Sequence, residues 1–265
     1  VQYEIILIDN ASTECNADLF LEEFPGIVLI KSSINGGFAK GNNLGIQQAK
    51  GEYILLLNSD TILIENSIGK CFKYIKTKIN IGVLGCKMIY TNGKVQYTAR
   101  RFRSIKWELF DLFRIFLLLI PYKKRSKLML GKYFRHDENL ECDWLNGAFF
   151  LFPKKVIENL PEKKLDERFF MYGEDQLWCE QFKSLGHKCV FFSETTIIHI
   201  NNASTSYAKQ LSLRKVMLKH ELEIMKLRKG KGLYYLIFES IYLVKENLNL
   251  LIKLLFFKLT GKIIR

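Results

Sequence analysis

Residues 27–60 read IVLIKSSINGGFAKGNNLGIQQAKGEYILLLNSD, and this stretch decides the fold class. An apolar run at 27–31 precedes a glycine-rich stretch, a helical pattern from about 41 to 49, and a second apolar run that ends at Ser59 and Asp60. Short apolar runs bounded by turn residues are typical of buried strands. Strands that alternate with helices predict an α/β fold, a mostly parallel sheet with helices on both faces.

The same alternation continues on both sides of this stretch. YEIILI at 3–8 predicts a strand that ends at Asp9, and helices are expected at 16–23 and 174–185. Further strands are expected at 82–90, 143–152, 188–194 and 197–200. Ligands of such sheets bind beyond the carboxyl ends of the strands, where Asp9 and Asp60 both fall.

Composition narrows the classes of partner. The 265 residues are 48% hydrophobic, enough for one large domain or a domain with an appendage. A net charge of +13 favours anionic partners such as nucleic acid, nucleotide diphosphates or an acidic membrane surface. The basic residues cluster with long aliphatic runs rather than with a stacking platform, so nucleic acid is not expected as a partner.

The six cysteines show neither CxxC nor close Cys/His spacing. We therefore expect reduced, mostly buried thiols and no zinc site. No secretory signal opens the chain, and a cytoplasmic protein is expected.

Two segments combine basic and apolar residues. At 100–131 basic residues surround the run FRIFLLLIP, which is too short and too charged at its flanks to span a bilayer. It predicts either a surface amphipathic helix or a core helix. Residues 209–265 form a basic, amphipathic helical extension with an apolar helix at 233–259. This extension is expected either to hold the protein peripherally at an anionic membrane surface or to bind a partner or a second copy.

Individual polar residues allow a chemical and a structural interpretation. Asp60, with Asn58 beside it, could bind Mg²⁺ or Mn²⁺, or simply form a turn at the strand end. The glycine-rich loop could cradle phosphates with Lys40, or be an ordinary turn. Glu174 and Asp175 could supply a general base, or an acidic helix start. His199 could complete a metal site, or be a core or surface histidine.

Taken together and in order, these motifs resemble the inverting glycosyltransferases of family 2, especially the rhamnosyltransferase-like branch. The resemblance spans roughly residues 1–206 and depends on DNAS at 9–12, NGGFAKGNN at 35–43, LLLNSDT at 55–61, NGA at 146–148, DERFFMYGED at 166–175, and His199.

The resemblance implies a GT-A fold and transfer of a sugar from a nucleoside-diphosphate sugar to an acceptor hydroxyl. It implies that Asp9 contacts the nucleobase and that Asp60 and His199 bind Mg²⁺ or Mn²⁺. It also implies that Asp175 is the catalytic general base, with Glu174 beside it. It places the remaining donor contacts at Asn10, Ser12, Asn35, Gly37, Phe38, Lys40, Asn43, Asn58 and Gly147. The metal would stabilise the leaving diphosphate as its charge grows.

The chain departs from the family pattern in two ways that matter here. The family ordinarily begins with a strand and a helix before the strand at 3–8, and both are absent, so an open apolar sheet edge is expected. Either the sequence is a fragment or donor binding is impaired. Asn58 also stands where the DxD-type motif begins with an acid, which removes one negative charge from the expected metal site.

The resulting interpretation is a GT-A domain at 1–208 followed by the helical extension at 209–265. The enzyme would build a surface polysaccharide by transferring a sugar, with rhamnose as the family-level expectation, to a glycan or lipid-linked acceptor. It would act at the inner face of the cell membrane, and its extension could mediate oligomerisation. A sugar-phosphate nucleotidyltransferase and a non-catalytic remnant are the alternatives.

Overall fold

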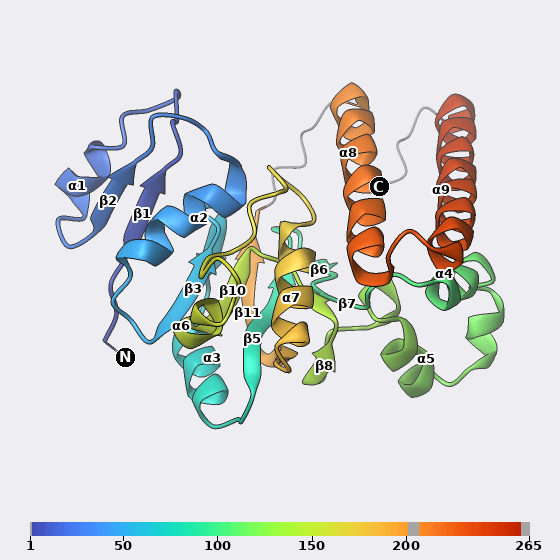
Figure 1. Cartoon of the computed structure of the whole chain (residues 1–265), viewed down its shortest axis with the longest axis horizontal. Helices are drawn as coiled ribbons and strands as arrows, with labels where there is room; N and C mark the ends of the chain where they lie inside the picture. The colour runs from blue at the N-terminus through green and yellow to red at the C-terminus, as the bar shows by residue number, and fades with distance from the viewer. Residues whose placement is uncertain (1, 201–206, 261–265) are drawn as a thin grey trace.

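The computed structural model describes residues 2–200 and 207–260 (Figure 1). In chain order its elements are β1 Ile6–Asp9, α1 Leu19–Glu23, β2 Val28–Lys31, α2 Gly37–Gln48, β3 Tyr53–Leu57, β4 Thr61–Leu63, α3 Ser67–Lys76, β5 Ile81–Ile89, β6 Val95–Gln96, β7 Ala99–Arg100, α4 Ile105–Leu112, η1 Phe116–Leu119, α5 Tyr122–Met129, η2 Gly131–Tyr133, β8 Leu140–Cys142, β9 Trp144–Leu145, β10 Phe149–Pro153, α6 Lys154–Glu158, α7 Glu174–Ser184, β11 Lys188–His199, α8 Tyr207–Lys229 and α9 Leu233–Thr260.

The larger sheet follows the order β3-β10-β5-β11-β4, with β6 on β5 and β8 on β11. Strands β5 and β11 run parallel, and β10 runs antiparallel to both of its neighbours β3 and β5. Helices α3 and α7 both pack against β5 and β11. The predicted α/β class is confirmed, with β3, β5 and β11 as the parallel set of a mixed sheet.

Strands β1 and β2 form a separate parallel pair in the register Ile6 to Val28. They lie beside β3 in Figure 1, but β3 is the terminal strand of the larger sheet and shares no ladder with β1. Glu4 joins the two parts, since its Oε1 accepts hydrogen bonds from the backbone N–H groups of Lys50 and Gly51 at 2.7 and 3.0 Å. Strand β3 is therefore an edge strand of the larger sheet in the described residues.

Strand β10 lies between two apolar layers. Phe150 and Phe152 pack in the core that contains Trp178 and Phe182 of α7, whereas Phe149 and Leu151 pack on the opposite face in the core that contains Cys71 and Ile75 of α3. A strand covered on both faces is apolar at every position. This burial explains the continuous FFLF run of β10.

The structure differs from the predicted elements in three details. Helix α2 begins at Gly37 instead of near residue 41, so the glycine-rich stretch forms its first turn. The predicted strand at 143–152 is divided into β9 and β10 by Asn146, Gly147 and Ala148. The strands expected at 188–194 and 197–200 are one strand, β11, with an irregularity between Phe192 and Thr196.

The segment at 100–131 forms neither of the two helices that the sequence allowed. Ser104 caps α4 by accepting a hydrogen bond from Trp107 N at 3.1 Å, and the helix ends at Leu112. The apolar run continues as the 3-10 helix η1, in which Leu117 is buried while Phe116, Leu118 and Leu119 are exposed. The run that was predicted as a surface or a core helix is therefore a single short 3-10 helix, which ends before Pro121.

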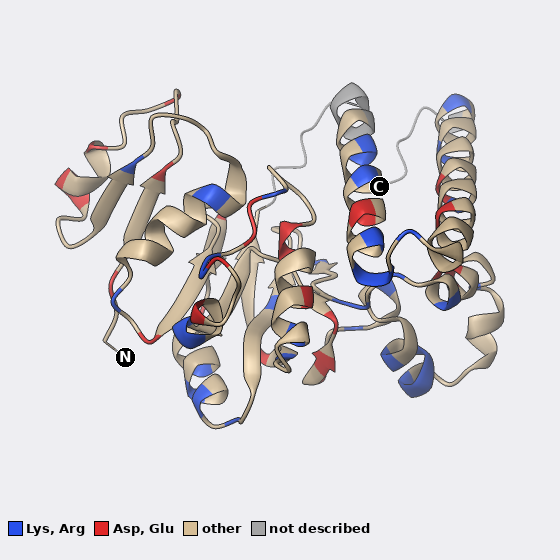
Figure 2. Cartoon of the chain, viewed as in Figure 1, with Lys and Arg blue, Asp and Glu red and all other residues tan. Residues whose placement is uncertain are grey.

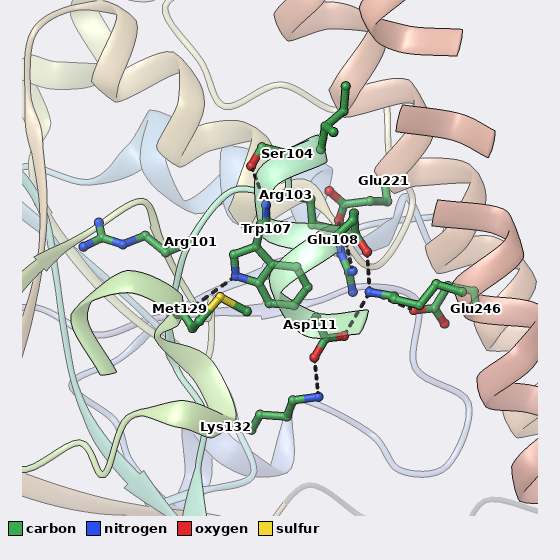
Figure 3. Close-up of polar contacts among 12 residues, drawn as sticks. Arg101, Arg103, Ser104, Trp107, Glu108, Asp111, Met129, Lys132, Glu221 and Glu246 are labelled. Carbon is green, nitrogen blue, oxygen red and sulfur yellow. Dashed lines mark hydrogen bonds and ion pairs between the residues drawn. The ribbon is translucent and has the colours of Figure 1, made fainter. Parts of the chain in front are cut away.

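Helices α8 and α9 pack against the rest of the fold through buried charges (Figure 3). Lys245 of α9 is buried between Glu108 and Asp111 of α4, with its Nζ 3.0 Å from Asp111 Oδ2. Arg228 of α8 pairs with Glu180 of α7 at 3.0 Å. The expected helical extension is therefore tied to the sheet domain in residues 207–260, and its last residues, 261–265, lie outside the described part.

Two further expectations concern thiols and membrane spans. Five of the six free cysteines are buried and Cys15 is exposed, so the expectation of mostly buried thiols is confirmed. Within residues 2–200 and 207–260, each helix is either too short or too polar to cross a bilayer.

Candidate active site

Asp175 lies in the first turn of α7, where the backbone holds its carboxylate. Gly147 N donates to Asp175 Oδ2 at 3.1 Å, and Gln176 N donates to Oδ1 at 2.8 Å. Burial raises the pKa of Asp175, and these two backbone donors together with the charge of Arg100 oppose part of that rise. The net pKa lies above the usual range of an aspartate, which suits a general base.

Glu174 precedes Asp175 and is more deeply buried. Burial, with the negative charge of Asp175 as a second cause, raises the pKa of Glu174 to about 8. Its Oε2 is buried without a hydrogen-bond partner among the described residues. The two neighbouring carboxyl groups therefore interact as they titrate, and Glu174 binds its proton up to a higher pH than an ordinary glutamate does.

The loop between β9 and β10 connects this base with a second polar cluster. A Cβ added at Gly147 would lie 3.2 Å from the ring of Phe38 and 3.4 Å from Cβ of Asp175. The next residue, Ala148, accepts a hydrogen bond from Asn58 N at 3.0 Å. Residues 147 and 148 therefore position the base and the end of β3 from the same piece of backbone.

The second cluster contains Asn58, Asp60 and His199. Asp60 lies in the turn between β3 and β4, and His199 is the last residue of β11. His199 Nε2 lies 3.2 Å from Asp60 Oδ1 and 3.4 Å from Asn58 Nδ2. The sheet thus brings together three residues whose positions in the sequence are 58, 60 and 199.

Gln96 fixes the orientation of His199, and sequence reasoning missed it. Gln96 Oε1 lies 2.9 Å from His199 Nδ1, and Gln96 Nε2 donates to the backbone carbonyl of His199 at 2.6 Å. Because an amide oxygen can only accept, His199 Nδ1 donates to Gln96 Oε1, and this hydrogen bond fixes the ring so that Nε2 faces Asp60. No local pattern could have identified Gln96, since it lies in a two-residue strand.

The composition of this cluster fits a hard divalent cation. Across the described residues, no group of three or more His, Cys, Asp or Glu side chains is placed to hold a metal. Asp60 and His199 supply two ligands, and Asn58 Oδ1 is a buried oxygen with no hydrogen-bond partner in the described structure. A carboxylate, an amide oxygen and an imidazole are donors that Mg²⁺ and Mn²⁺ accept, so the residues present fit such an ion.

The structure also brings together the residues at the ends of β1 and β2 that were predicted to bind the nucleotide-sugar donor. Asn10 Nδ2 donates to Asn35 Oδ1 and to Gly37 O, both at 3.1 Å, and its Oδ1 accepts from Gly36 N at 3.1 Å. Asp9 Oδ1 accepts from Ser12 N at 2.8 Å, and this hydrogen bond lowers the pKa of Asp9. The carboxylate of Asp9 therefore remains ionised beside the glycine-rich turn.

The glycine-rich turn also contacts the DERFFMYGED loop. Phe38 N donates to Phe170 O at 3.0 Å, and a Cβ at Gly37 would lie only 2.3 Å from that carbonyl. Gly37 also has φ +85°, a conformation that favours glycine. Any larger residue at position 37 would collide with the backbone of Phe170, so close packing favours glycine there.

Asn43 and Lys40, which were also predicted to bind the nucleotide-sugar donor, differ from each other in burial. Asn43 is buried, and its Nδ2 donates to Leu165 O and Glu167 Oε1, both at 2.8 Å. Asn43 therefore links α2 to the start of the DERFFMYGED loop. Lys40 lies exposed on α2. The donor-binding roles of both residues remain predictions.

Arg100 is a second residue that sequence reasoning did not place in the site. It pairs with Trp144 across β7 and β9, and its guanidinium lies 4.9 Å from the centre of the Trp144 ring. Its side chain is exposed and close enough to Asp175 to affect the pKa of that carboxylate. The sequence marked it only as one of several basic residues near 100–131.

The fold is GT-A-like. The chain aligns with a mannosyltransferase from Pyrobaculum calidifontis in complex with GDP-Man and Mn²⁺, with a TM-score of 0.55 and 13% identity over 90% of this chain and 58% of that one. It also aligns with GalNAc-T7 bound to UDP, GalNAc and Mn²⁺, with a TM-score of 0.54 and 18% identity over 84% of this chain and 41% of that one.

The family follows from the sequence comparison. A family model described as Glycosyl transferase family 2 matches residues 2–139, and the chain belongs to this family. It is 25% identical over 206 residues to the O-antigen biosynthesis protein RfbC of Myxococcus xanthus, covering 76% of this chain and 15% of that protein. It is 35% identical over 85 residues to the glycosyltransferase GlyG of Streptococcus pneumoniae, covering 31% and 28% of the two chains.

Proposed function

We propose that this chain is an inverting, metal-dependent glycosyltransferase that moves a sugar from a nucleoside diphosphate to an acceptor hydroxyl. The observation that carries the proposal is the carboxylate pair at the start of α7. Gly147 N donates to Asp175, burial raises the pKa of Asp175, and burial raises the pKa of Glu174 beside it to about 8. The backbone of Gly147 and Ala148 connects this base to the cluster of Asn58, Asp60 and His199.

The reaction we propose is a single displacement. Asp175 accepts the proton of the acceptor hydroxyl while that oxygen attacks the anomeric carbon from the face opposite the leaving group. The new glycosidic bond forms as the bond from the anomeric carbon to the diphosphate oxygen breaks, so the configuration inverts. The electron pair of the broken bond leaves with the nucleoside diphosphate.

Asp60 and His199, with the amide oxygen of Asn58, would hold Mg²⁺ or Mn²⁺ at the diphosphate. A bound divalent cation supplies electrostatic stabilisation of the negative charge that develops on the leaving group. Gln96 keeps His199 in the required tautomer, and the ionised Asp9 with Asn10 borders the glycine-rich turn where we place the nucleoside.

The proposed acceptor is a glycan or a lipid-linked sugar used in surface polysaccharide synthesis. The names of two relatives support this choice, the O-antigen biosynthesis protein of M. xanthus and a poly(ribitol-phosphate) beta-glucosyltransferase of Bacillus spizizenii, 31% identical over 35% of this chain and 15% of that protein. Rhamnose remains the proposed sugar. The net charge of +13 supports a cytoplasmic enzyme that acts peripherally at the anionic inner face of the cell membrane.

A donor screen that measures released nucleoside diphosphate tests the proposal. With the right donor, acceptor and Mn²⁺, release should depend on acceptor and the product should have inverted configuration. Asp175→Asn should abolish turnover and leave donor binding close to wild type, whereas the exposed acid of Glu162→Gln should leave turnover unchanged. Retained turnover in Asp175→Asn would refute the assignment of Asp175 as the general base. If the folded wild type bound no nucleoside diphosphate, a non-catalytic remnant would be favoured.

A further inference from the structure

The connection between α4 and α5 exposes a compact set of large apolar side chains. Ile115, Leu118 and Leu119 are 76%, 68% and 83% exposed, and they are joined by Leu112, Phe113 and Phe116. We call residues 112–119 the apolar wedge. Single exposed apolar residues are common on protein surfaces, but a contiguous group of this kind marks an interaction site.

Basic residues predominate in the apolar wedge and in the residues that follow it, up to residue 136. Residues 112–136 contain no acid and seven basic residues, Arg114, Lys123, Lys124, Arg125, Lys127, Lys132 and Arg135. Lys127 and Lys132 form ion pairs with Glu138 and Asp111, while none of the ion pairs among the described residues involves Arg114, Lys123 or Lys124. In Figure 2 the connection between α4 and α5 is mostly tan and α5 is largely blue.

The apolar wedge is held in place from behind. Leu117 is buried, and Asp111 at the end of α4 accepts hydrogen bonds from Tyr133 Oη at 2.6 Å and from Lys245 Nζ at 3.0 Å. Figure 3 shows the ion pair of Asp111 with Lys132. Trp107 Nε1 donates to Met129 O at 3.1 Å, which joins α4 to the end of α5. The exposed side chains are therefore displayed by an anchored turn.

The backbone of the apolar wedge satisfies its own hydrogen bonds. The N–H groups of Phe116, Leu117 and Leu118 donate to carbonyls three residues earlier, and Ile120 N donates to Leu117 O. A segment whose backbone is internally bonded can enter an apolar environment without leaving polar groups unsatisfied.

We propose that the apolar wedge docks this protein on an anionic lipid surface, with Phe116, Leu118 and Leu119 entering the headgroup–acyl boundary and Lys123 and Lys124 contacting lipid phosphates. Apolar side chains flanked by basic residues are the chemistry of interfacial membrane binding. A second copy of the chain is the less suitable occupant, since two apolar wedges would bring like charges together. The proposal specifies the surface behind the membrane location proposed above, and its test requires no transferase activity.

Sedimentation with phosphatidylglycerol–phosphatidylcholine vesicles and with pure phosphatidylcholine vesicles tests this. The whole chain should bind the anionic vesicles more tightly. Ile115→Ser/Phe116→Ser/Leu119→Ser should weaken that binding at least about tenfold, while Ile79→Ser, at a site 94% exposed, should not. Lys123→Glu/Lys124→Glu should also weaken it at least about tenfold, while Lys73→Glu/Lys76→Glu on α3, with the same change in net charge, should leave most of it.

Leu119→Trp provides a second readout that keeps the surface apolar and does not threaten folding. Its fluorescence should shift to the blue and be quenched by brominated acyl chains in anionic vesicles, relative to the wild type with its buried and half-buried tryptophans. Three results would overturn the proposal: a folded wild type that ignores anionic vesicles, wedge variants that bind like wild type, or a wild-type dimer that the serine variant converts to a monomer with vesicle binding unchanged.

Discussion

His199 Nε2 lies 3.2 Å from Asp60 Oδ1, although the two residues are separated by almost the whole sheet domain in sequence. The contact forms because β11 pairs with β4 in a register that places His199 opposite Thr61, directly after Asp60. This pair, with Asn58, is the part of the site best suited to a divalent cation.

Replacement of Asp60 should weaken metal-dependent donor binding. Asp60→Ala removes the carboxylate that we assign to the ion, so binding of a nucleoside diphosphate in the presence of Mn²⁺ should fall at least about tenfold. Titration calorimetry with and without Mn²⁺ measures this. Glu158→Ala, an exposed acid of α6, serves as the control. Equal Mn²⁺-dependent binding in wild type and Asp60→Ala would remove Asp60 from the metal site.

Gln96 should act through His199 without contacting substrate. Gln96→Ala frees the imidazole to rotate and change tautomer, and partners of this kind typically contribute about 10–100-fold to metal affinity. The apparent Mn²⁺ affinity, measured by electron paramagnetic resonance of the free ion, should fall by that factor. Gln96→Glu should recover part of the loss because its carboxylate still accepts from Nδ1–H, and the exposed Gln47→Ala should have no effect. An unchanged affinity in Gln96→Ala would contradict the assignment.

A side chain at Gly147 should displace the base. The added Cβ of Gly147→Ala would lie 3.2 Å from the Phe38 ring and 3.4 Å from Cβ of Asp175. A small displacement of a catalytic group costs roughly ten- to a hundredfold in rate, so kcat should fall by that factor with little change in the melting temperature. Gly232→Ala, where nothing lies within 4 Å, is the matched control. Wild-type kcat in Gly147→Ala would show that the backbone bond at 147 does not position Asp175.

The raised pKa of Glu174 makes stability depend on pH. Its pKa rises from 4.5 to about 8 on folding, so between these values the folded state binds the extra proton and the free energy of unfolding falls as pH rises. Relative to Glu174→Gln, wild type should lose at least about 1.4 kcal/mol, the equivalent of one pKa unit, between pH 4.5 and 8. Urea unfolding at several pH values measures this, with the exposed Glu158→Gln as the control. Parallel pH profiles for wild type and Glu174→Gln would show that Glu174 does not bind this proton.

Lys245 should be essential for attaching the C-terminal helices. Lys245→Met would leave Glu108 and Asp111 buried without their shared cation, and breaking such a cluster typically costs about 3–5 kcal/mol. Chemical denaturation should show that loss. Lys253→Met, an exposed lysine of the same helix, should change stability by no more than about 0.5 kcal/mol. Equal stability of the two variants would mean that α9 is held by its apolar contacts alone.

Local sequence patterns predicted most helices and strands, because the spacing of apolar residues and the position of turn residues are set by neighbouring positions in the chain. The strands around Leu7, Leu29 and Leu55, helix α7 and the order of the motifs were all readable in this way. Sequence failed where long-range packing overrides propensity. The glycines at 36 and 37 read as a loop, yet they are the N-cap and the first residue of α2, and Gly37 packs against Phe170.

The candidate site was predictable as motifs but not as an arrangement. Asp60, Asp175 and His199 were identified from strand and helix ends and from a family resemblance, whereas Gln96 and Arg100 carry no local signal. Their importance depends on ladders between distant strands, β5 with β6 and β7 with β9. Strand pairing is set by the whole core.

The sequence alone therefore determined the α/β class, the family resemblance and the residues able to do the chemistry, because these depend on residue type and spacing. Only the tertiary structure decided which of them meet and in what state. Burial raises the pKa of Glu174, Gln96 orients His199, and the anchoring of α4 by Lys245 leaves the apolar wedge exposed. The two properties of Glu174 and His199 arise from contacts between segments far apart in the chain, and no local pattern encodes such contacts.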